Sequence, residues 1–445
     1  MASNSGALGA SNDILVLGRF TATQFGILCV CFFSMMLDGF DIAIIAYTAP
    51  FISDDWSIRA EQLGVVFSAG LLGMTLGSMF MASLADIYGR RVLVSLALIM
   101  TGAATVAVAY IGSVTELVIL RFICGLGLGS LLAVVPALAG EYSPASYRNF
   151  IVAIMVAGTS TGSVVGGLIS AWFIPEYGWR ALFFYNGVAN ILVGTVYFLA
   201  VPESITHLVT RRPRDALGKI NRVLAYIGHD SIERLPERQS LANDSATVRA
   251  LLTPSRRTMT LLVWGAFAAL FAVSYFVTSW LPKLLVNAGF PSQDSIYTVV
   301  ILTFGGILGT ALIGYLSRWF TLNRLVGLSL AMATVLTVLL SLLMRGGDPA
   351  LIPWIWALSF GVGVTLMGSV GNLYSIAMVI YPPHIKITGI GWCCGIGRAV
   401  AIISPALAGL LLGMGVAAAA VLALFAIAIA LAGIFTNLLR VREMQ

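Results

Sequence analysis

Two aspartates, Asp38 and Asp41, lie in a run of apolar residues that otherwise carries no charge from Phe25 to Ile52. Carboxylates are rare in segments apolar enough to cross a membrane, and they usually mark a functional site there. On a helix, residues three apart share a face. Burial and mutual repulsion both favour a protonated carboxyl, so the pair could exchange a proton near neutral pH. Alternatively, one aspartate caps a broken helix and the other faces a water-filled vestibule.

Arg121 also lies in an apolar segment, near the outer end of that segment by its expected boundaries. A buried guanidinium needs an anion, and Asp38 or Asp41 is a candidate partner. Glycines that follow Arg121 would allow neighbouring helices to approach closely. A static ion pair that joins two helices is the alternative to a functional role.

Arg398 lies in the middle of another apolar segment, where Gly395, Gly397 and Trp392 flank it. An arginine in such a segment is costly unless it meets an anion. The planar guanidinium suits bidentate binding of a carboxylate. We therefore expect Arg398 to contact an anionic substrate, with a structural salt bridge or a clamp on main-chain carbonyls as the alternatives.

Several aromatic side chains could form walls around an aromatic ring by stacking. Aromatic residues in membrane helices also serve as packing groups or as anchors at the membrane interface, and this alternative stays open for each of them. The candidates are Phe40, Tyr275, Phe276, Trp280, Tyr374 and Trp392.

The composition is that of a polytopic membrane protein. Of 445 residues, 59% are hydrophobic and 10% are charged, and the mean hydropathy is +0.96; a soluble protein carries about 25% charged residues. The excess of basic residues follows from membrane topology and needs no nucleic-acid partner. The five cysteines lie in apolar segments without CxxC spacing, so we expect no metal site and no disulfide. No nucleophile–base pair, phosphate loop or metal-ligand spacing predicts an enzyme or a cofactor.

Twelve apolar segments are long enough to span a bilayer. A polar stretch divides them into six and six, which predicts an N-terminal bundle (1–201), a central loop (202–257) and a C-terminal bundle (258–445). The fold class is therefore an all-α membrane protein with twelve transmembrane helices in two six-helix bundles. The expected spans are 22–50, 61–84, 92–112, 115–140, 150–173, 180–202, 258–286, 294–317, 323–344, 350–381, 387–412 and 415–438.

Lysines and arginines gather in the loops of one side, including the central loop. Because cytoplasmic loops carry this excess, we expect a multi-pass protein of the bacterial inner membrane with both termini in the cytoplasm. Residues 215–224 of the central loop are amphipathic and predict a short surface helix.

The two halves repeat one another. Gly73-x3-Gly77 precedes Leu84, which lies eleven residues after Gly73, and Gly305-x3-Gly309 precedes Leu316 at the same spacing. Parallel repeats within one chain are typical of secondary transporters, whose binding site lies near the membrane midplane between the halves.

Residues 84–91, Leu-Ala-Asp-Ile-Tyr-Gly-Arg-Arg, resemble the signature between segments 2 and 3 of the major facilitator superfamily, with Ala82 in place of the leading glycine. Residues 121–129 resemble its segment 4 motif, and Pro-Glu-Ser at 202–204 resembles the end of segment 6 in its sugar and organic-ion branches. The second copy of the first signature is degenerate, because Arg318 stands where Asp86 stands.

Three further patches are similar to the aromatic acid:H+ symporter family of this superfamily: residues 38–41, 275–282 and 388–398. The resemblance covers essentially the whole chain. It implies import of a benzoate- or hydroxybenzoate-like carboxylate together with H+, with Asp38, Asp41 and Arg121 in proton coupling. The expected substrate contacts are Arg398, Asp41, Phe40, Tyr275, Trp280 and Trp392.

Charged residues at the cytoplasmic ends of the segments are expected to act as latches that close the inner face rather than as substrate ligands. This gating set comprises Asp86, Gly89, Arg90, Arg91, Glu141 and Arg148.

Segment 5 carries glycines at 158, 162, 166 and 167, which predict a packing face for another helix. The face lacks the proline of the superfamily's antiporter motif, which argues against a drug exporter.

Two rival functions stay open. One is proton-coupled transport of a sugar or another organic anion, although segment 7 has no glutamine and few of the donors that a sugar site needs. The other is a membrane sensor with a transporter fold that moves no substrate; no long signalling domain favours it.

Overall fold

In a computed structural model, the chain is described over residues 20–144, 146–235, 251–254, 256–381 and 385–439. Within these ranges the description leaves out the side chains of Ala82, Ser83, Asp86, Asn149, Lys386 and Ile387.

The described chain consists of helices joined by turns and loops. The first half contains α2 (Ala22–Trp56), α3 (Ala60–Leu76), the π-helical turn η1 (Gly77–Met81), α4 (Ala82–Tyr88), α5 (Arg90–Val108), α6 (Val114–Glu141) and α7 (Arg148–Ala200). The segment between the halves contains α8 (Ile205–Arg211) and α9 (Ala216–Tyr226). The second half contains α11 (Arg257–Asn287), α12 (Ser292–Leu316), α13 (Leu322–Leu343), η2 (Pro349–Leu351), α14 (Ile352–Val362), the π-helical turn η3 (Gly363–Met367), α15 (Gly368–Ile380), α16 (Lys386–Gly413) and α17 (Ala418–Leu438).

The helix α7 is two membrane spans in one. It contains 53 residues, which at 1.5 Å per residue would extend about 80 Å, more than twice the roughly 30 Å of a bilayer core. Gly178 interrupts it with a φ of 79° and a ψ of 163°, a conformation open to glycine. The described residues form eleven continuous helices able to cross a membrane, and dividing α7 at Gly178 gives the twelve spans predicted from sequence.

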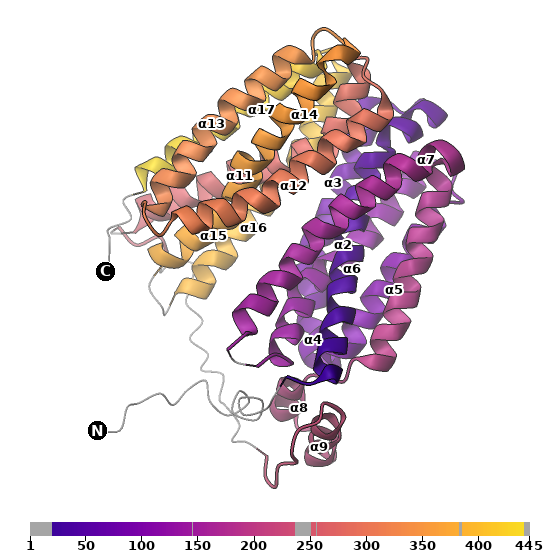
Figure 1. Cartoon of the computed structure of the whole chain (residues 1–445), viewed down its shortest axis with the longest axis vertical. Helices are drawn as coiled ribbons and strands as arrows, with labels where there is room; N and C mark the ends of the chain where they lie inside the picture. The colour runs from indigo at the N-terminus through magenta and orange to yellow at the C-terminus, as the bar shows by residue number, and fades with distance from the viewer. Residues whose placement is uncertain (1–19, 145, 236–250, 255, 382–384, 440–445) are drawn as a thin grey trace.

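The two halves form two bundles that lie side by side (Figure 1). In that view the bundles approach each other at the upper end, and their helices diverge toward the end that carries α8 and α9. Helix α3 packs on α16, α7 on α12, and α2 on α11 across the contact between the halves.

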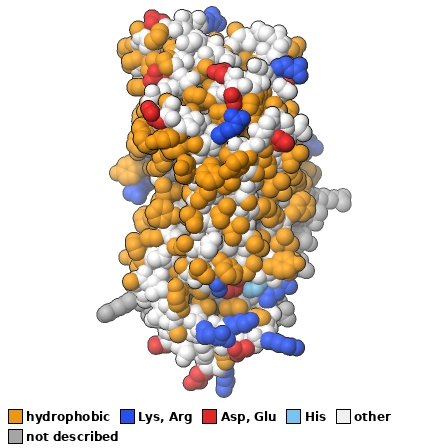
Figure 2. All heavy atoms as spheres, turned by 90° about the vertical axis from the view of Figure 1, so that its right-hand side faces the viewer, with side chains coloured by type: hydrophobic (Ala, Val, Ile, Leu, Met, Phe, Trp, Pro, Cys, Tyr) orange, Lys and Arg blue, Asp and Glu red, His pale blue; other side chains and the backbone are white. Residues whose placement is uncertain are grey.

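One face of the molecule shows an apolar belt between two ends where charged side chains gather (Figure 2). Many large apolar side chains are exposed on the helices, among them Trp172 at 63% and Leu199 at 74%. Such a belt matches the hydrocarbon region of a bilayer, and the charged ends match its two aqueous surfaces.

The glycine repeat of the sequence has the same structural role in both halves. A Cβ atom on Gly73 or Gly77 would lie 2.2 Å from the carbonyl oxygen of Phe122 and 2.1 Å from that of Leu126, respectively. Glycine therefore allows the backbones of α3 and α6 to touch.

In the second half, a Cβ on Gly305 would lie 2.5 Å from the carbonyl oxygen of Phe360, and a Cβ on Gly309 would lie 2.0 Å from that of Val364. Each partner pair is again four residues apart, so α12 packs on α14 and η3 as α3 packs on α6. The predicted internal repeat is confirmed at the level of helix packing.

The predicted glycine face on α7 packs along α2. A Cβ on Gly162 would lie 1.8 Å from the carbonyl oxygen of Met36, and one on Gly166 would lie 2.2 Å from the ring of Phe40. Gly39 of α2 is equally restricted, since its Cβ would lie 1.8 Å from the carbonyl oxygen of Thr159. The glycine between the two aspartates therefore brings α2 against α7.

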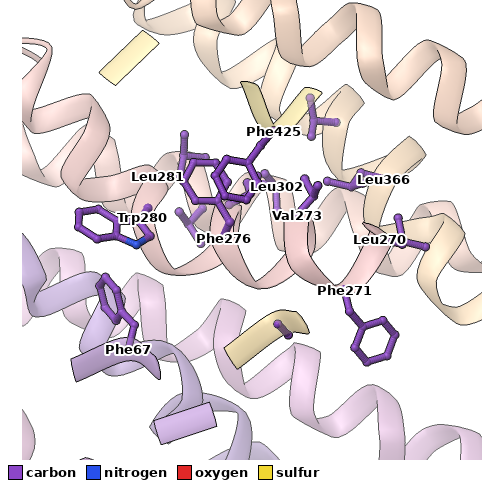
Figure 3. Packing of buried hydrophobic residues seen from close by; sticks show 14 of the residues in the cluster. Phe67, Leu270, Phe271, Val273, Phe276, Trp280, Leu281, Leu302, Leu366 and Phe425 are labelled. Carbon is purple, nitrogen blue, oxygen red and sulfur yellow. The ribbon is translucent and has the colours of Figure 1, made fainter. Parts of the chain in front are cut away.

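The halves meet tightly at the end away from α8 and α9. Trp280 of α11 is fully buried, donates its indole N–H to the carbonyl of Pro405 at 3.1 Å, and packs edge-on against Phe67 of α3 at 5.4 Å (Figure 3). Alongside, a Cβ on Gly64 would lie 2.7 Å from the same Pro405 oxygen. Apolar contacts and backbone proximity close this end of the interface.

The amphipathic segment at 215–224 forms the helix α9, as predicted. Ala216, Ile220, Val223 and Leu224 are its buried residues. Just beyond α9, the carbonyl of Ile227 accepts a hydrogen bond from Thr21, which caps α2, at 2.9 Å. The start of α2 therefore lies at the same end of the molecule as the segment between the halves.

Candidate functional site at the contact between the halves

Asp38 and Asp41 are both fully buried on α2, but their surroundings differ. The carboxylate of Asp41 accepts a hydrogen bond from each of two amides, Asn186 at 2.7 Å on Oδ1 and Asn190 at 2.7 Å on Oδ2. Thr105 donates a third at 3.2 Å to Oδ1. Asp41 thus points into the interior of the first bundle, toward α5 and the second span of α7.

A pair of glycines brings these donors within reach of Asp41. A Cβ on Gly102 would lie 2.6 Å from the carbonyl oxygen of Gly187, and a Cβ on Gly187 would lie 2.6 Å from that of Gly102. The helices α5 and α7 touch at this crossing. On α5, Thr105 lies one turn after Gly102, and on α7 the two asparagines lie within one turn of Gly187. The donors on both helices therefore converge on one carboxylate.

Arg121 lies beside Asp41 but binds its main chain. The guanidinium is 3% exposed, and its Nη2 donates to the carbonyl oxygen of Asp41 at 2.9 Å. Its Nε and Nη1 have no hydrogen-bond partner within the described part of the chain. The ion pairs found there within 4.0 Å do not join Arg121 to Asp38 or to Asp41. Arg121 therefore lies next to Asp41, as expected, but it contacts the main-chain carbonyl of Asp41 and not its carboxylate.

Asp38 faces the other half. Neither of its carboxylate oxygens has a hydrogen-bond partner among the residues that the structure describes. The hydroxyl of Tyr275, on α11, lies close enough to Asp38 and to Arg398 for both charges to act on it. The unpartnered carboxyl is therefore the one at the contact between the bundles.

Arg398 reaches across this contact from α16. Its Nη1 donates to Ser78 Oγ at 2.7 Å, and Ser78 belongs to the π-helical turn η1. Such turns are frequent at functional sites. A small pocket adjoins the guanidinium, lined by Leu71, Met74, Thr75, Tyr275, Arg398 and Ala401.

The pocket lies next to the closed end of the interface. Along α3 its residues follow Phe67, and along α11 and α16 its residues precede Trp280 and Pro405. All three helices therefore place the pocket on the α8 side of the Phe67–Trp280 contact.

The structure brings together some of the expected aromatic residues and not others. Tyr275 lies 6.1 Å from Phe271 between ring centroids, and Phe271 lies 6.3 Å from Tyr374. Phe40 is 9% exposed and packs against Gly166 within the first half.

The remaining three aromatic candidates lie apart from Arg398. Trp280 is the buried contact between the halves described above, and Phe276 stacks on Phe425 at 3.7 Å (Figure 3). Trp392 is 43% exposed and stacks on Trp264 at 6.0 Å. In this conformation they pack against protein rather than line the pocket.

The expected latch residues form a network at the end of the first half near α8. The guanidinium of Arg90 pairs with Glu141, which also accepts a hydrogen bond from Ser204 at 2.6 Å. The carboxylate of Glu203 accepts the backbone N–H of Arg90 at 2.7 Å. A Cβ on Gly89, whose φ is +104°, would lie 2.2 Å from Glu203. These contacts tie the start of α5 to the end of α6 and to the segment between the halves.

Arg91 donates to the carbonyl of Phe198 at 2.7 Å and lies over its ring at 4.4 Å. Arg148 donates from Nε to the carbonyl of Gly140 at 3.0 Å. The side chain of Asp86 lies outside the described residues. Nearby, burial raises the pKa of the Tyr142 hydroxyl well above its usual value, so it remains a donor, here to the Glu203 carbonyl at 2.8 Å.

Sequence reasoning missed the neutral partners of the charged groups. Thr105, Asn186, Asn190 and Ser78 were not predicted, and neither was the role of Glu203. Two asparagines four residues apart in an apolar span were the available signal, because an amide in a membrane helix also needs partners.

Two six-helix bundles with charged residues within and between them are the architecture of secondary membrane transporters. The sequence profile described as the Major Facilitator Superfamily matches residues 31–405. The chain therefore belongs to the Major Facilitator Superfamily.

Curated relatives and solved structures agree with this assignment. The chain is 30% identical over 396 residues to the 4-hydroxybenzoate transporter PcaK of Acinetobacter baylyi, covering 88% of this chain and 85% of the relative. It is 26% identical over 415 residues to the benzoate transport protein of the same organism, covering 91% and 86%. A bacterial homologue of the human lysosomal transporter Spinster, in an inward-facing and occupied conformation, superposes with a TM-score of 0.72 at 17% identity over 95% and 97% of the two chains.

Proposed function

We propose that this protein imports a single-ring aromatic carboxylate together with protons across the bacterial inner membrane by alternating access, and that it catalyses no chemical conversion. The observation that carries the proposal is the similarity to 4-hydroxybenzoate and benzoate transporters over about nine-tenths of the chain.

The pocket beside Arg398 supports a carboxylate substrate. The guanidinium has a single hydrogen bond, to Ser78, among the described residues, so donors remain for an anion. Tyr275 lines the same pocket, and the ring of Phe271 lies 6.1 Å from that of Tyr275, so aromatic faces are available for a ring. In this conformation the pocket has room for about one water molecule. A substrate would therefore bind once the surrounding side chains have moved apart, with its carboxylate on Arg398 in a bidentate manner and its ring against Tyr275.

The buried aspartates support proton coupling. The substrate enters as an anion, and one cotransported proton neutralises its charge. Any further proton makes uptake sensitive to the membrane potential, by about 2.3 kcal/mol per charge per 100 mV. Asp38 lies across from Tyr275, so proton binding and substrate binding would occur side by side.

The contact between the halves supports an inward-facing state. If the basic central segment is cytoplasmic, the end closed by Phe67 and Trp280 is the outer one. The pocket beside Arg398 would then open toward the cytoplasm.

The test is uptake into proteoliposomes with an acidic exterior, measured with labelled 4-hydroxybenzoate and benzoate and with xylose as a control. The proposal predicts accumulation of an aromatic acid above its external concentration and loss of that accumulation when a protonophore is added. Failure of both acids to accumulate, or accumulation that ignores the protonophore, would contradict it.

A further inference from the structure

The two aspartates of α2 differ in the number of donors that they meet. Asp41 accepts hydrogen bonds from Asn186, Asn190 and Thr105, and Asp38 accepts none from the described residues. Both side chains are fully buried, so exposure does not separate them. The donors are what make the two sites different.

Hydrogen bonds to a carboxylate stabilise its charged form. Both amides direct Nδ2 to Asp41, which is the orientation that an ionised, acceptor-only carboxylate requires. A buried carboxylate without donors is far less stable than its neutral form. The geometry alone therefore assigns opposite protonation states to the two side chains in this conformation.

The charged and titratable groups around each aspartate agree with this assignment. From α6, Arg121 lies at the main chain of Asp41, and Cys124 contacts Thr105 at 3.1 Å between sulfur and oxygen. From α2, each aspartate of the pair is the near charge to the other, while Asp54 and Asp55 lie at the far end of the helix in ion pairs with Lys283 and Arg180. The positive charge of Arg121 thus lies beside the aspartate that has the donors.

The titratable groups near Asp38 are Asp41 of its own helix and Tyr275 of the other half. Tyr275 of α11 lies near Asp38, and Arg398 of α16 lies near Tyr275. Both belong to the pocket. A proton on Asp38 is therefore next to the place where a substrate would bind, while Asp41 is enclosed within the first bundle.

We propose that Asn186 and Asn190 are positioning residues that hold Asp41 as a fixed anion, so that Asp38 is the carboxylate that takes up and releases the transported proton. The coupling part of this inference depends on the proposed function, but the assignment of charge does not. The fixed anion also explains the position of Arg121, whose charge Asp41 balances without a direct ion pair.

The test is infrared spectroscopy of the purified full-length protein without substrate, following the C=O stretch of protonated carboxyl groups as the pH is raised. The expected result is that Asp38→Asn removes a carboxyl band present at pH 7 and that Asp41→Asn leaves this band in place. The opposite pattern, a band removed by Asp41→Asn and kept in Asp38→Asn, would overturn the proposal.

Removing one donor tests the role of the amides. In Asn190→Leu, and separately in Asn186→Leu, a second carboxyl band should appear and should vanish when Asp41→Asn is added. Loss of one hydrogen bond to a charged group should raise the pH at which the Asp41 band disappears by roughly one to two units. Asn190→Gln, which can still donate, should restore part of the shift.

Asn372→Leu is the matched control, because Asn372 is also a buried asparagine but bonds to the carbonyls of Thr310 and Gly368 in the other half. It should leave the Asp38 band unchanged and produce no second band. If the donor variants behave like this control, the amides do not hold the charge of Asp41. The spectra require no substrate, so a failure of aromatic acid uptake in proteoliposomes would leave this test valid, and the two proposals can fail separately.

Discussion

The two halves of the molecule share their backbone packing and differ in their buried charges. Phe122 contacts Gly73 as Phe360 contacts Gly305. The residue before each phenylalanine is Arg121 in one half and Ser359 in the other, and both are buried. The position that carries a guanidinium in the first half thus carries a hydroxyl in the second.

The two halves therefore share the glycines at their helix crossings but not the buried charged side chains between those crossings. Glycines at the helix crossings are restricted in both halves, because any Cβ would meet a neighbouring main chain. Side chains between those crossings are under no such restriction. In our account the first half holds the acids that handle the proton, and the second half supplies Arg398 and the aromatic faces that bind the substrate.

The largest expected effect lies in the first half. Asp38→Asn and Asp41→Asn should each abolish uphill uptake in proteoliposomes, because an amide can neither carry a proton nor hold a charge. Counterflow exchange should survive better in Asp38→Asn. Asp55→Asn, which removes an exposed partner of Arg180, is the control and should transport normally. Full accumulation by both Asp38→Asn and Asp41→Asn would show that the first half does not handle the proton.

The next effect lies in the second half. Arg398→Ala should weaken binding of 4-hydroxybenzoate by about 2–5 kcal/mol if the carboxylate pair is buried. Arg398→Lys should lose less binding free energy, because lysine keeps the positive charge. It should still bind more weakly than wild type, because lysine lacks the planar guanidinium. The methyl ester should bind weakly and nearly equally to wild type and Arg398→Ala, as calorimetry in detergent would measure. An undiminished preference for the acid in Arg398→Ala would exclude Arg398 as the ligand and favour Arg121.

A structural role for Arg398 makes a different forecast. In that case Arg398→Ala would lower the melting temperature, and binding of acid and ester would fall together. Melting curves recorded on the same samples separate the two outcomes.

A smaller effect tests the packing that the halves share. Gly77→Ala and Gly309→Ala should each destabilise the protein by about 1–3 kcal/mol, because the new methyl group would collide with a carbonyl. Gly26→Ala, in α2 where a Cβ meets nothing within 4 Å, should be neutral or stabilising by up to about 1 kcal/mol. The measurement is thermal unfolding in detergent. If only one of Gly77→Ala and Gly309→Ala is destabilised, the equivalent glycines of the two halves do not contribute equally to stability.

The smallest effect concerns the ion pair between the halves at their closed end. Lys283 lies 3.4 Å from Asp54, whose side chain is 71% exposed. Such a pair contributes about 1 kcal/mol or less, so Lys283→Gln should shift cysteine accessibility between the two faces no more than severalfold. A complete change of accessible face would show that the pair, rather than the apolar contacts around Trp280, closes this end.

Much of the fold could be predicted from sequence, because membrane spans and glycine repeats are local patterns. The twelve spans follow from hydropathy, and even the break at Gly178 falls between two predicted segments. The π-helical turn at Ser78 could not be predicted, since it depends on how α3 packs against its neighbours.

The site was predictable where charge alone marks it. Asp38, Asp41, Arg121 and Arg398 are conspicuous in apolar segments, and the structure places Arg398 across the contact between the halves and Asp41 and Arg121 within the first bundle. Which aspartate meets Asn190 was not predictable, because residues three apart on a helix point about 60° from each other and only the neighbouring helices decide. Trp280 was expected to contact the substrate. It lies instead in the closed interface, where it donates to the Pro405 carbonyl. Sequence alone could not predict this contact, because it depends on the conformation of the two halves.

The most direct test of this division between the halves is to record proton movement and 4-hydroxybenzoate movement together in the same proteoliposomes, for wild type, Asp38→Asn and Arg398→Ala. We predict that wild type moves both, that Asp38→Asn exchanges substrate without moving protons, and that Arg398→Ala moves neither. Proton movement that still accompanies substrate in Asp38→Asn would contradict this prediction.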